Sequence, residues 1–153
     1  MKIAGIDPKL LPSMEVLVLP RGDQRLVFRA RGVSDTTEFK KLCPEPKIPV
    51  RLTATGPEQN LNHPDYKSEM QEYGKRYIAW LVLKSLEPSE IEWDTVKIDV
   101  PGTWVNWEED MRQGGLSQHE CNLVVALVSQ ANSLDEAKLK AARDVFLRGP
   151  QPE

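Results

Sequence analysis

Apolar and polar residues alternate near the beginning of the chain. Two runs of β-forming residues, MEVLVLP and QRLVFRAR, lie within residues 14–32 on either side of a connection that contains Gly22. In the second run every other residue from Leu26 to Ala30 is apolar and directed to one side. Period-two alternation is typical of a strand with one solvent-exposed face, and a short glycine-containing connection is typical of a hairpin. Residues 14–32 therefore predict a β-hairpin.

Helix signals follow the hairpin. Ser34 and Asp35 can each cap a short helix, and Glu38 stands three residues after Asp35, as in a capping box. Pro44 disfavours helical geometry in the residue before it and lacks the amide hydrogen that a helix needs. We therefore expect a short helix that ends at Cys43.

Three prolines lie within the next six residues, in LCPEPKIPV. A zinc knuckle would need a second cysteine or histidine two to four residues from Cys43, and none is there. The prolines predict an extended, stiff join, with a peptide-recognition motif as the alternative. The join leads into an expected edge strand at Val50–Thr55, and the Gly-, Pro- and Asn-rich residues 56–64 predict an exposed, mobile loop.

The longest helical pattern runs from about residue 64 to residue 86. Its aromatic and methionine side chains recur at spacings of four and three, which places them on one helical face: Tyr66, Met70, Tyr73, Tyr77 and Trp80. The second half of the segment is apolar almost all round. We expect it to form the centre of the core, because such a stripe more often packs than binds a ligand.

The remaining segments predict one strand and three helices. Alternation in TVKIDV, residues 95–100, predicts a final strand beside the hairpin, and Trp104, Trp107 and Met111 lie on one face of a short helix that ends at Gly114 and Gly115. Two capping boxes, Ser117 with Glu120 and Ser133 with Glu136, begin two further helices, expected as an αα-hairpin joined at residues 131–133.

Together these patterns predict an α+β fold: an N-terminal β-hairpin with one or two further strands, then a helical C-terminal half. Residues 1–153 are expected to form a single domain, with 14–55 mainly β with a short helix and 64–148 mainly helical. The hydrophobic fraction of 40% and the charged fraction of 28% are ordinary for a soluble globular protein. A chain of 153 residues is long enough to bury a core without staples.

The charge balance and the N-terminus bear on partners and location. The formal net charge is −3, with basic residues scattered among acids, which argues against binding nucleic acid. Asp7, Pro8 and Pro12 interrupt any signal-peptide core, and no apolar run is long enough to span a membrane, so we expect a cytoplasmic chain. In a reducing compartment Cys43 and Cys121 are expected to stay thiols.

The sequence contains no recognisable catalytic motif. The two histidines, His63 and His119, have no neighbouring ligands at metal-binding spacing, and no glycine-rich phosphate loop occurs. Residues 108–110 are consecutive acids that spread around a helix, where they complement its dipole. We therefore expect no enzyme activity, no metal and no cofactor.

Tryptophan usage is the unusual feature, because Trp93, Trp104 and Trp107 fall within fifteen residues. Aromatic side chains are favoured as anchors in protein interfaces. Trp104, Trp107 and Met111 are therefore candidate partner-binding residues, with core packing as the alternative. Under the interface hypothesis, Trp104→Ala and Trp107→Ala weaken partner binding with a modest loss of stability; if both unfold the protein, the residues are core.

Three stretches resemble a known family: FRARGVSDTTEFKKLCPEPKIP, YIAWLVLKSLEPSEIEWDTV, and the segment from PGTWVNW to AARDVFL. They resemble tail assembly chaperones, small proteins encoded among the tail genes of long-tailed bacteriophages, over residues 16–147. The most specific parts are LCPEPKIP and ANSLDEAKLKAARDVFL.

The resemblance implies a non-enzymatic viral protein in the cytoplasm of an infected bacterial host. Such chaperones bind the long tape-measure protein and keep its apolar helices from aggregating until the tail tube protein polymerises around it; they use no cofactor. Two alternatives remain, a structural tail or head-tail subunit of the virion and a small phage inhibitor of a host defence protein. The sequence leaves homo-oligomerisation open, and the family supplies no binding residue for this chain.

Overall fold

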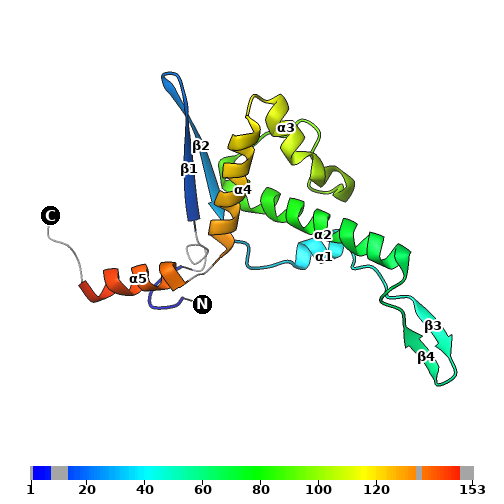
Figure 1. Cartoon of the computed structure of the whole chain (residues 1–153). Helices are drawn as coiled ribbons and strands as arrows, with labels where there is room; N and C mark the ends of the chain where they lie inside the picture. Colours follow the sequence, from blue (N-terminus) through cyan, green and yellow to red (C-terminus); the bar gives the residue numbers. More distant parts are fainter. Residues whose placement is uncertain (1, 8–13, 134–135, 149–153) are drawn as a thin grey trace.

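The structure is a computed structural model that describes residues 2–7, 14–133 and 136–148. It has the predicted α+β architecture: an N-terminal antiparallel hairpin, a second small sheet and a helical C-terminal half (Figure 1). In chain order the elements are β1 (Met14–Arg21), β2 (Gln24–Arg31), α1 (Thr37–Leu42), β3 (Val50–Thr53), β4 (Gly56–Gln59), α2 (Pro64–Ser85), η2 (Glu87–Ser89), η3 (Pro101–Asn106), α3 (Trp107–Gln113), α4 (Gln118–Asn132) and α5 (Glu136–Arg148).

The predicted β1–β2 hairpin is confirmed. The two strands are antiparallel, with Leu17 opposite Phe28 and Leu19 opposite Leu26. Gly22 in the turn has φ +59°, a backbone conformation that glycine adopts without strain. One face of the hairpin joins the hydrophobic core through Leu19, Phe28 and Ala30, so the alternation in the sequence is the pattern of burial.

Helix α1 ends where it was predicted to end, but its start differs in detail. The Asp35 carboxylate accepts hydrogen bonds from the amide (2.9 Å) and hydroxyl (2.6 Å) of Thr37, and these bonds lower the pKa of Asp35. The expected capping box with Glu38 is wrong, because Glu38 pairs instead with Lys84 Nζ of α2 at 2.7 Å. An ion pair with a distant helix has displaced a local contact.

The expected mobile loop at residues 56–64 is partly wrong. Its first four residues form strand β4, which pairs with β3 from Val50 opposite Gln59 to Thr53 opposite Gly56. Gly56 has φ +117°, and the Thr53 hydroxyl donates to the Gly56 carbonyl at 2.7 Å, so the turn chemistry itself creates the hairpin. Residues 44–49 between α1 and β3 contain neither helix nor strand, as expected for the proline-rich join.

The long helix is confirmed as α2, and its second half lies at the centre of the core. Trp80 is 1% exposed, and the buried Phe39 of α1 lies against the predicted aromatic stripe. The ring centroid of Phe39 lies 5.3 Å from that of Tyr73, 5.1 Å from that of Tyr77 and 5.5 Å from that of Trp80. Such aromatic pairs add stabilisation beyond the area they bury.

The predicted strand at residues 95–100 is wrong, because its polar atoms are used elsewhere. The amide and hydroxyl of Thr95 donate to the Asp110 carboxylate at 2.9 and 2.7 Å. The amide of Lys97 donates to the Thr103 hydroxyl at 2.9 Å, and that hydroxyl lies 3.0 Å from the Lys97 carbonyl. Val96 is the one residue of the segment that is buried, so side chains from α3 and η3 hold the segment as a loop.

The last helices begin as the sequence indicates where the structure describes them. The capping box of α4 is confirmed: Ser117 Oγ accepts from the Glu120 amide, and the Glu120 carboxylate accepts from the Ser117 amide. The second predicted capping box pairs Ser133 with Glu136, and the Glu136 side chain lies outside the described part. Figure 1 shows α5 extending away from α4, so the expected αα-hairpin packing is not formed.

Candidate binding groove

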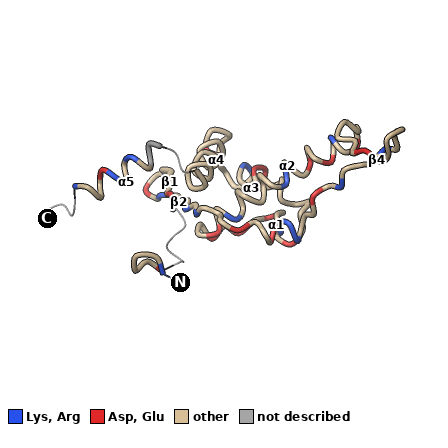
Figure 2. Tube along the Cα trace, turned by 90° about the horizontal axis from the view of Figure 1, so that it is seen from below, with Lys and Arg blue, Asp and Glu red and all other residues tan. Residues whose placement is uncertain are grey.

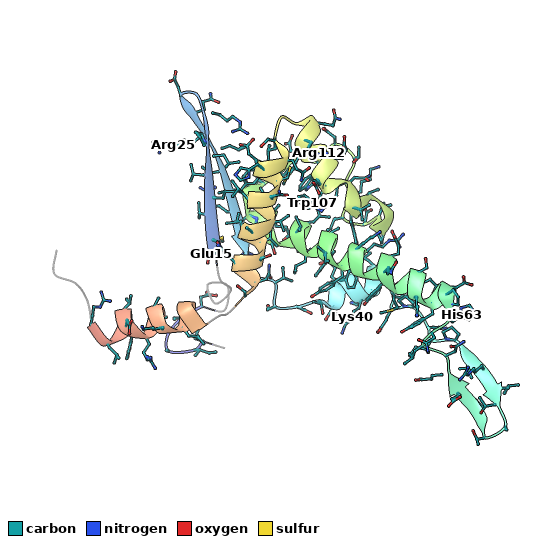
Figure 3. All side chains as sticks on the ribbon, in the orientation of Figure 1. Glu15, Arg25, Lys40, His63, Trp107 and Arg112 are labelled. Carbon is teal, nitrogen blue, oxygen red and sulfur yellow. The ribbon has the colours of Figure 1, made fainter. Side chains whose placement is uncertain are left out.

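The predicted partner-binding residues lie inside the core. Trp104, Trp107 and Met111 are 0%, 8% and 5% exposed, and Figure 3 shows Trp107 pointing from α3 into the interior. Trp104 Nε1 donates to the Ile98 carbonyl at 3.1 Å. Core packing accounts for both tryptophans, so alanine at either position is expected to destabilise the fold instead of selectively weakening a partner.

Met111 also lines a surface groove of about 370 Å³, where β2, the segment after η2 and the end of α3 meet. The floor of the groove is apolar and is formed by Leu26, Phe28, Ile91, Trp93, Met111 and Leu116. Exposed carboxylate side chains from Glu90, Glu92 and Asp94 lie among the remaining lining residues. The groove thus combines an apolar floor with an acidic rim.

The segment that carries the acidic rim, residues 90–94, is held by hydrogen bonds at both ends. At one end Ser89 Oγ lies 2.7 Å from both the amide and the carbonyl of Arg29, which ties η2 to the outer edge of β2. The chain then turns at Glu90, whose φ is +52°. At the other end Asp110 holds the backbone of Thr95 and Val96. The segment between these two anchors is therefore pre-formed, and little ordering is needed on binding.

Asp110 contributes to the groove as a structural carboxylate. Burial opposes its ionisation, but hydrogen bonds from the Thr95 amide and hydroxyl and from the Val96 amide lower its pKa below the ordinary value. Its oxygens accept bonds at 2.9, 2.7 and 3.3 Å. A carboxylate stabilised in this way is a weak general base, because its proton affinity is reduced.

The other candidate chemical groups have structural positions. His63 is the N-cap of α2, where its Nδ1 accepts from the Asp65 amide at 3.2 Å. Cys43 and Cys121 are free thiols and are buried. Burial raises the pKa of the Cys121 thiol, and the nearby Glu108 carboxylate raises it further. Within the described residues no group of three His, Cys, Asp or Glu side chains could hold a metal ion.

A second groove, of about 290 Å³, lies beside the proline-rich join. Pro44 and Pro46 line it together with Cys43 and four residues of α2: Glu69, Glu72, Tyr73 and Arg76. The residues that line it carry charges of both signs.

Of the described helices, none has the length and apolar character to cross a membrane.

The groove was not predicted from the sequence. The alternation of acidic and apolar residues in EIEW, residues 90–93, is a signal that could have indicated one edge of it, and Trp93 and Met111 were singled out for other reasons. The alternation places Leu26 and Phe28 on the inner face of the hairpin, but their proximity to residues 91 and 116 depends on the tertiary fold.

Comparisons with protein-family models, with curated proteins and with solved structures found no match.

Proposed function

We propose that this chain is a non-enzymatic bacteriophage tail assembly chaperone that binds the tape-measure protein during tail morphogenesis. Two observations support the proposal: the sequence resemblance over residues 16–147, and the apolar groove floored by Phe28, Ile91 and Trp93. The groove carries the structural part of the argument, because the function requires a surface that shields apolar helix faces.

The groove matches one face of an amphipathic helix. Its volume of about 370 Å³ can take two or three apolar side chains presented at positions i, i+3 and i+7. Each such side chain contributes about 1.5–3 kcal/mol when fully buried, which gives reversible binding after the cost of association. The acidic rim favours a helix with lysine or arginine beside its apolar stripe.

The first test identifies the partner. The tagged chain is purified from phage-infected cells, and the eluate and purified virions are analysed by mass spectrometry. A chaperone enriches a long helical phage protein and is absent from virions. Presence in virions at fixed copy number would establish the structural subunit instead, and an eluate dominated by one host protein would establish the inhibitor.

The second test asks whether the groove holds the partner. Ile91→Asp places a charge on the apolar floor at a half-buried position, and we expect capture of the phage partner to fall at least tenfold while the circular dichroism spectrum is unchanged. Ile78→Asp is the matched control, because Ile78 is 60% exposed on α2 and does not line the groove. Equal capture by both variants would place the binding site elsewhere.

A further inference from the structure

Helix α5 presents an apolar stripe that its own chain leaves exposed. Leu139, Val145, Phe146 and Leu147 are 53%, 66%, 82% and 72% exposed. Leu139, Ala142 and Phe146 recur at i, i+3 and i+7, which places them on one side of the helix. Exposed apolar side chains in such a row mark an interaction surface. We propose that α5 of one copy docks into the acidic-rimmed groove of a second copy.

The two surfaces match in polarity and size. The groove floor is apolar, and its volume of about 370 Å³ can take Phe146 together with one or two smaller side chains of the stripe. Phe146 is the largest exposed apolar side chain on α5 and acts as the anchor, because aromatic residues seated in pockets dominate interface energetics. Leu139 lies two helical turns away on the same side, within reach of the groove margin.

The two surfaces also match in charge. Helix α5 carries four basic residues, Lys138, Lys140, Arg143 and Arg148, against two acidic ones, Glu136 and Asp144. Figure 2 shows basic residues along α5, which lies at the end of the molecule away from β4. Among the described residues, no ion pair involves Glu90, Glu92 or Asp94 of the rim, nor Lys140 or Arg143 of α5. Docking brings these opposite charges together, which favours and orients the encounter.

The geometry of one chain favours a second copy over the chain's own helix. The groove is lined by Gly114 and Leu116, just before α4 begins, whereas α5 follows the other end of α4. The 15 residues of α4 span about 22 Å, and α5 extends away from α4 at that far end (Figure 1), so α5 does not lie at the groove of its own chain. None of the groove residues belongs to α4 or α5. Exchange between two copies fills both grooves, and one two-fold axis can relate the two contacts.

This inference uses the groove of the proposed function but needs no phage partner. In the free protein, α5 of a second copy shields the apolar floor, and a partner helix displaces it. Self-association and partner capture are therefore competing reactions of one surface. Because self-association is measured on the isolated protein, its failure leaves the partner test intact, and failure of the partner test leaves self-association intact.

The first experiment measures the molar mass of the full chain by light scattering after size exclusion, over a range of concentrations. We expect the mass to rise above one chain with concentration and Phe146→Asp to weaken association at least tenfold. Leu52→Asp is the control, because Leu52 is 87% exposed on β3, away from both surfaces, and it should associate like the wild type. A wild type that stays monomeric at every concentration overturns the proposal.

The second experiment exchanges the charges. One chain carries Glu90→Lys and Glu92→Lys, the other carries Lys140→Glu and Arg143→Glu, and we expect each alone to be monomeric. An equimolar mixture should associate, because each rim then meets an α5 of opposite charge. If the mixture stays monomeric, or if hydrogen exchange shows α5 of a monomer protected by its own chain, docking into a second copy is excluded.

Discussion

The two β-hairpins of this chain have similar local chemistry and different surroundings. Both are antiparallel, and both turn at a glycine with positive φ, Gly22 and Gly56. The β1–β2 hairpin packs its inner face on α4 and the core, whereas β3 and β4 project beyond the N-terminal end of α2 (Figure 1). Leu52 of β3 is 87% exposed, whereas Phe28 of β2 is 5% exposed.

This difference shows where the stability of a hairpin comes from. Turn chemistry and strand pairing are sufficient to define both hairpins, but an isolated two-stranded hairpin is only marginally stable in water. The β1–β2 hairpin shares the core and is expected to unfold with the whole body. The β3–β4 hairpin is expected to open separately, at a much lower free energy.

The largest expected effect compares one apolar side chain from each hairpin. Phe28→Ala leaves a cavity in the core and should lower the free energy of unfolding by about 3–5 kcal/mol. Leu52→Ala should change it by less than about 0.5 kcal/mol, because the side chain is already in solvent. Urea unfolding monitored by tryptophan fluorescence gives both values. Similar losses in the two variants would show that the hairpins unfold together.

The next effect concerns the buried carboxylate that positions the acidic rim of the groove. Asp110→Asn replaces the charged acceptor of three hydrogen bonds with a neutral amide. We expect the free energy of unfolding to fall by about 1–3 kcal/mol near pH 7. The pKa of Asp110 is lower in the folded state, so the charged form stabilises the fold above the unfolded value of about 3.9, and this contribution is lost as pH falls below it.

Unfolding curves of the wild type and of Asp110→Asn should therefore differ at pH 7 and converge toward pH 2–3. A difference that is the same at both pH values would contradict the role of the ionised carboxylate. The β3–β4 hairpin contains no buried carboxylate, so the hydrogen-exchange rates of its amides should be the same in Asp110→Asn and the wild type. This measurement distinguishes unfolding of the core from separate opening of the β3–β4 hairpin.

The two turn glycines give a smaller and more direct comparison. Replacing Gly22 or Gly56 by alanine should destabilise the turn that contains it by about 1 kcal/mol or more, because both positions have positive φ. For Gly22→Ala we expect this cost in the global unfolding free energy. For Gly56→Ala we expect it only in the local opening of β3 and β4, measured by hydrogen exchange, with the global value unchanged. A global loss from Gly56→Ala would mean that the β3–β4 hairpin is coupled to the core.

The smallest effect concerns the ion pair between Arg51 and Glu58 across β3 and β4, at 3.4 Å. Both side chains are more than half exposed, so Glu58→Gln should change stability by less than about 0.5 kcal/mol. Thermal unfolding at low and high salt should give superimposable differences between the variant and the wild type. A loss above 1 kcal/mol would show that this hairpin has a stabilising role that its exposure does not indicate.

The sequence by itself determined most local elements. Period-two alternation in QRLVFRAR defined the first hairpin, aromatic spacing defined α2, and the Ser117–Glu120 capping box defined the start of α4. These signals succeed because backbone propensity, capping and the pattern of burial agree within a few residues. The turn of the second hairpin was equally local, but its glycine and proline were interpreted as a loop.

Only the tertiary structure decided which of these segments share a surface. Residues 95–100 alternate like a strand, yet Asp110 and Thr103 accept the hydrogen bonds of the amides of residues 95–97, which a neighbouring strand would otherwise need. Glu38 met Lys84 instead of capping its own helix. The candidate groove joins Leu26, Ile91 and Leu116 from three distant parts of the chain. Such juxtapositions depend on long-range packing, which no local periodicity encodes, and for that reason the groove was visible only once the chain was folded.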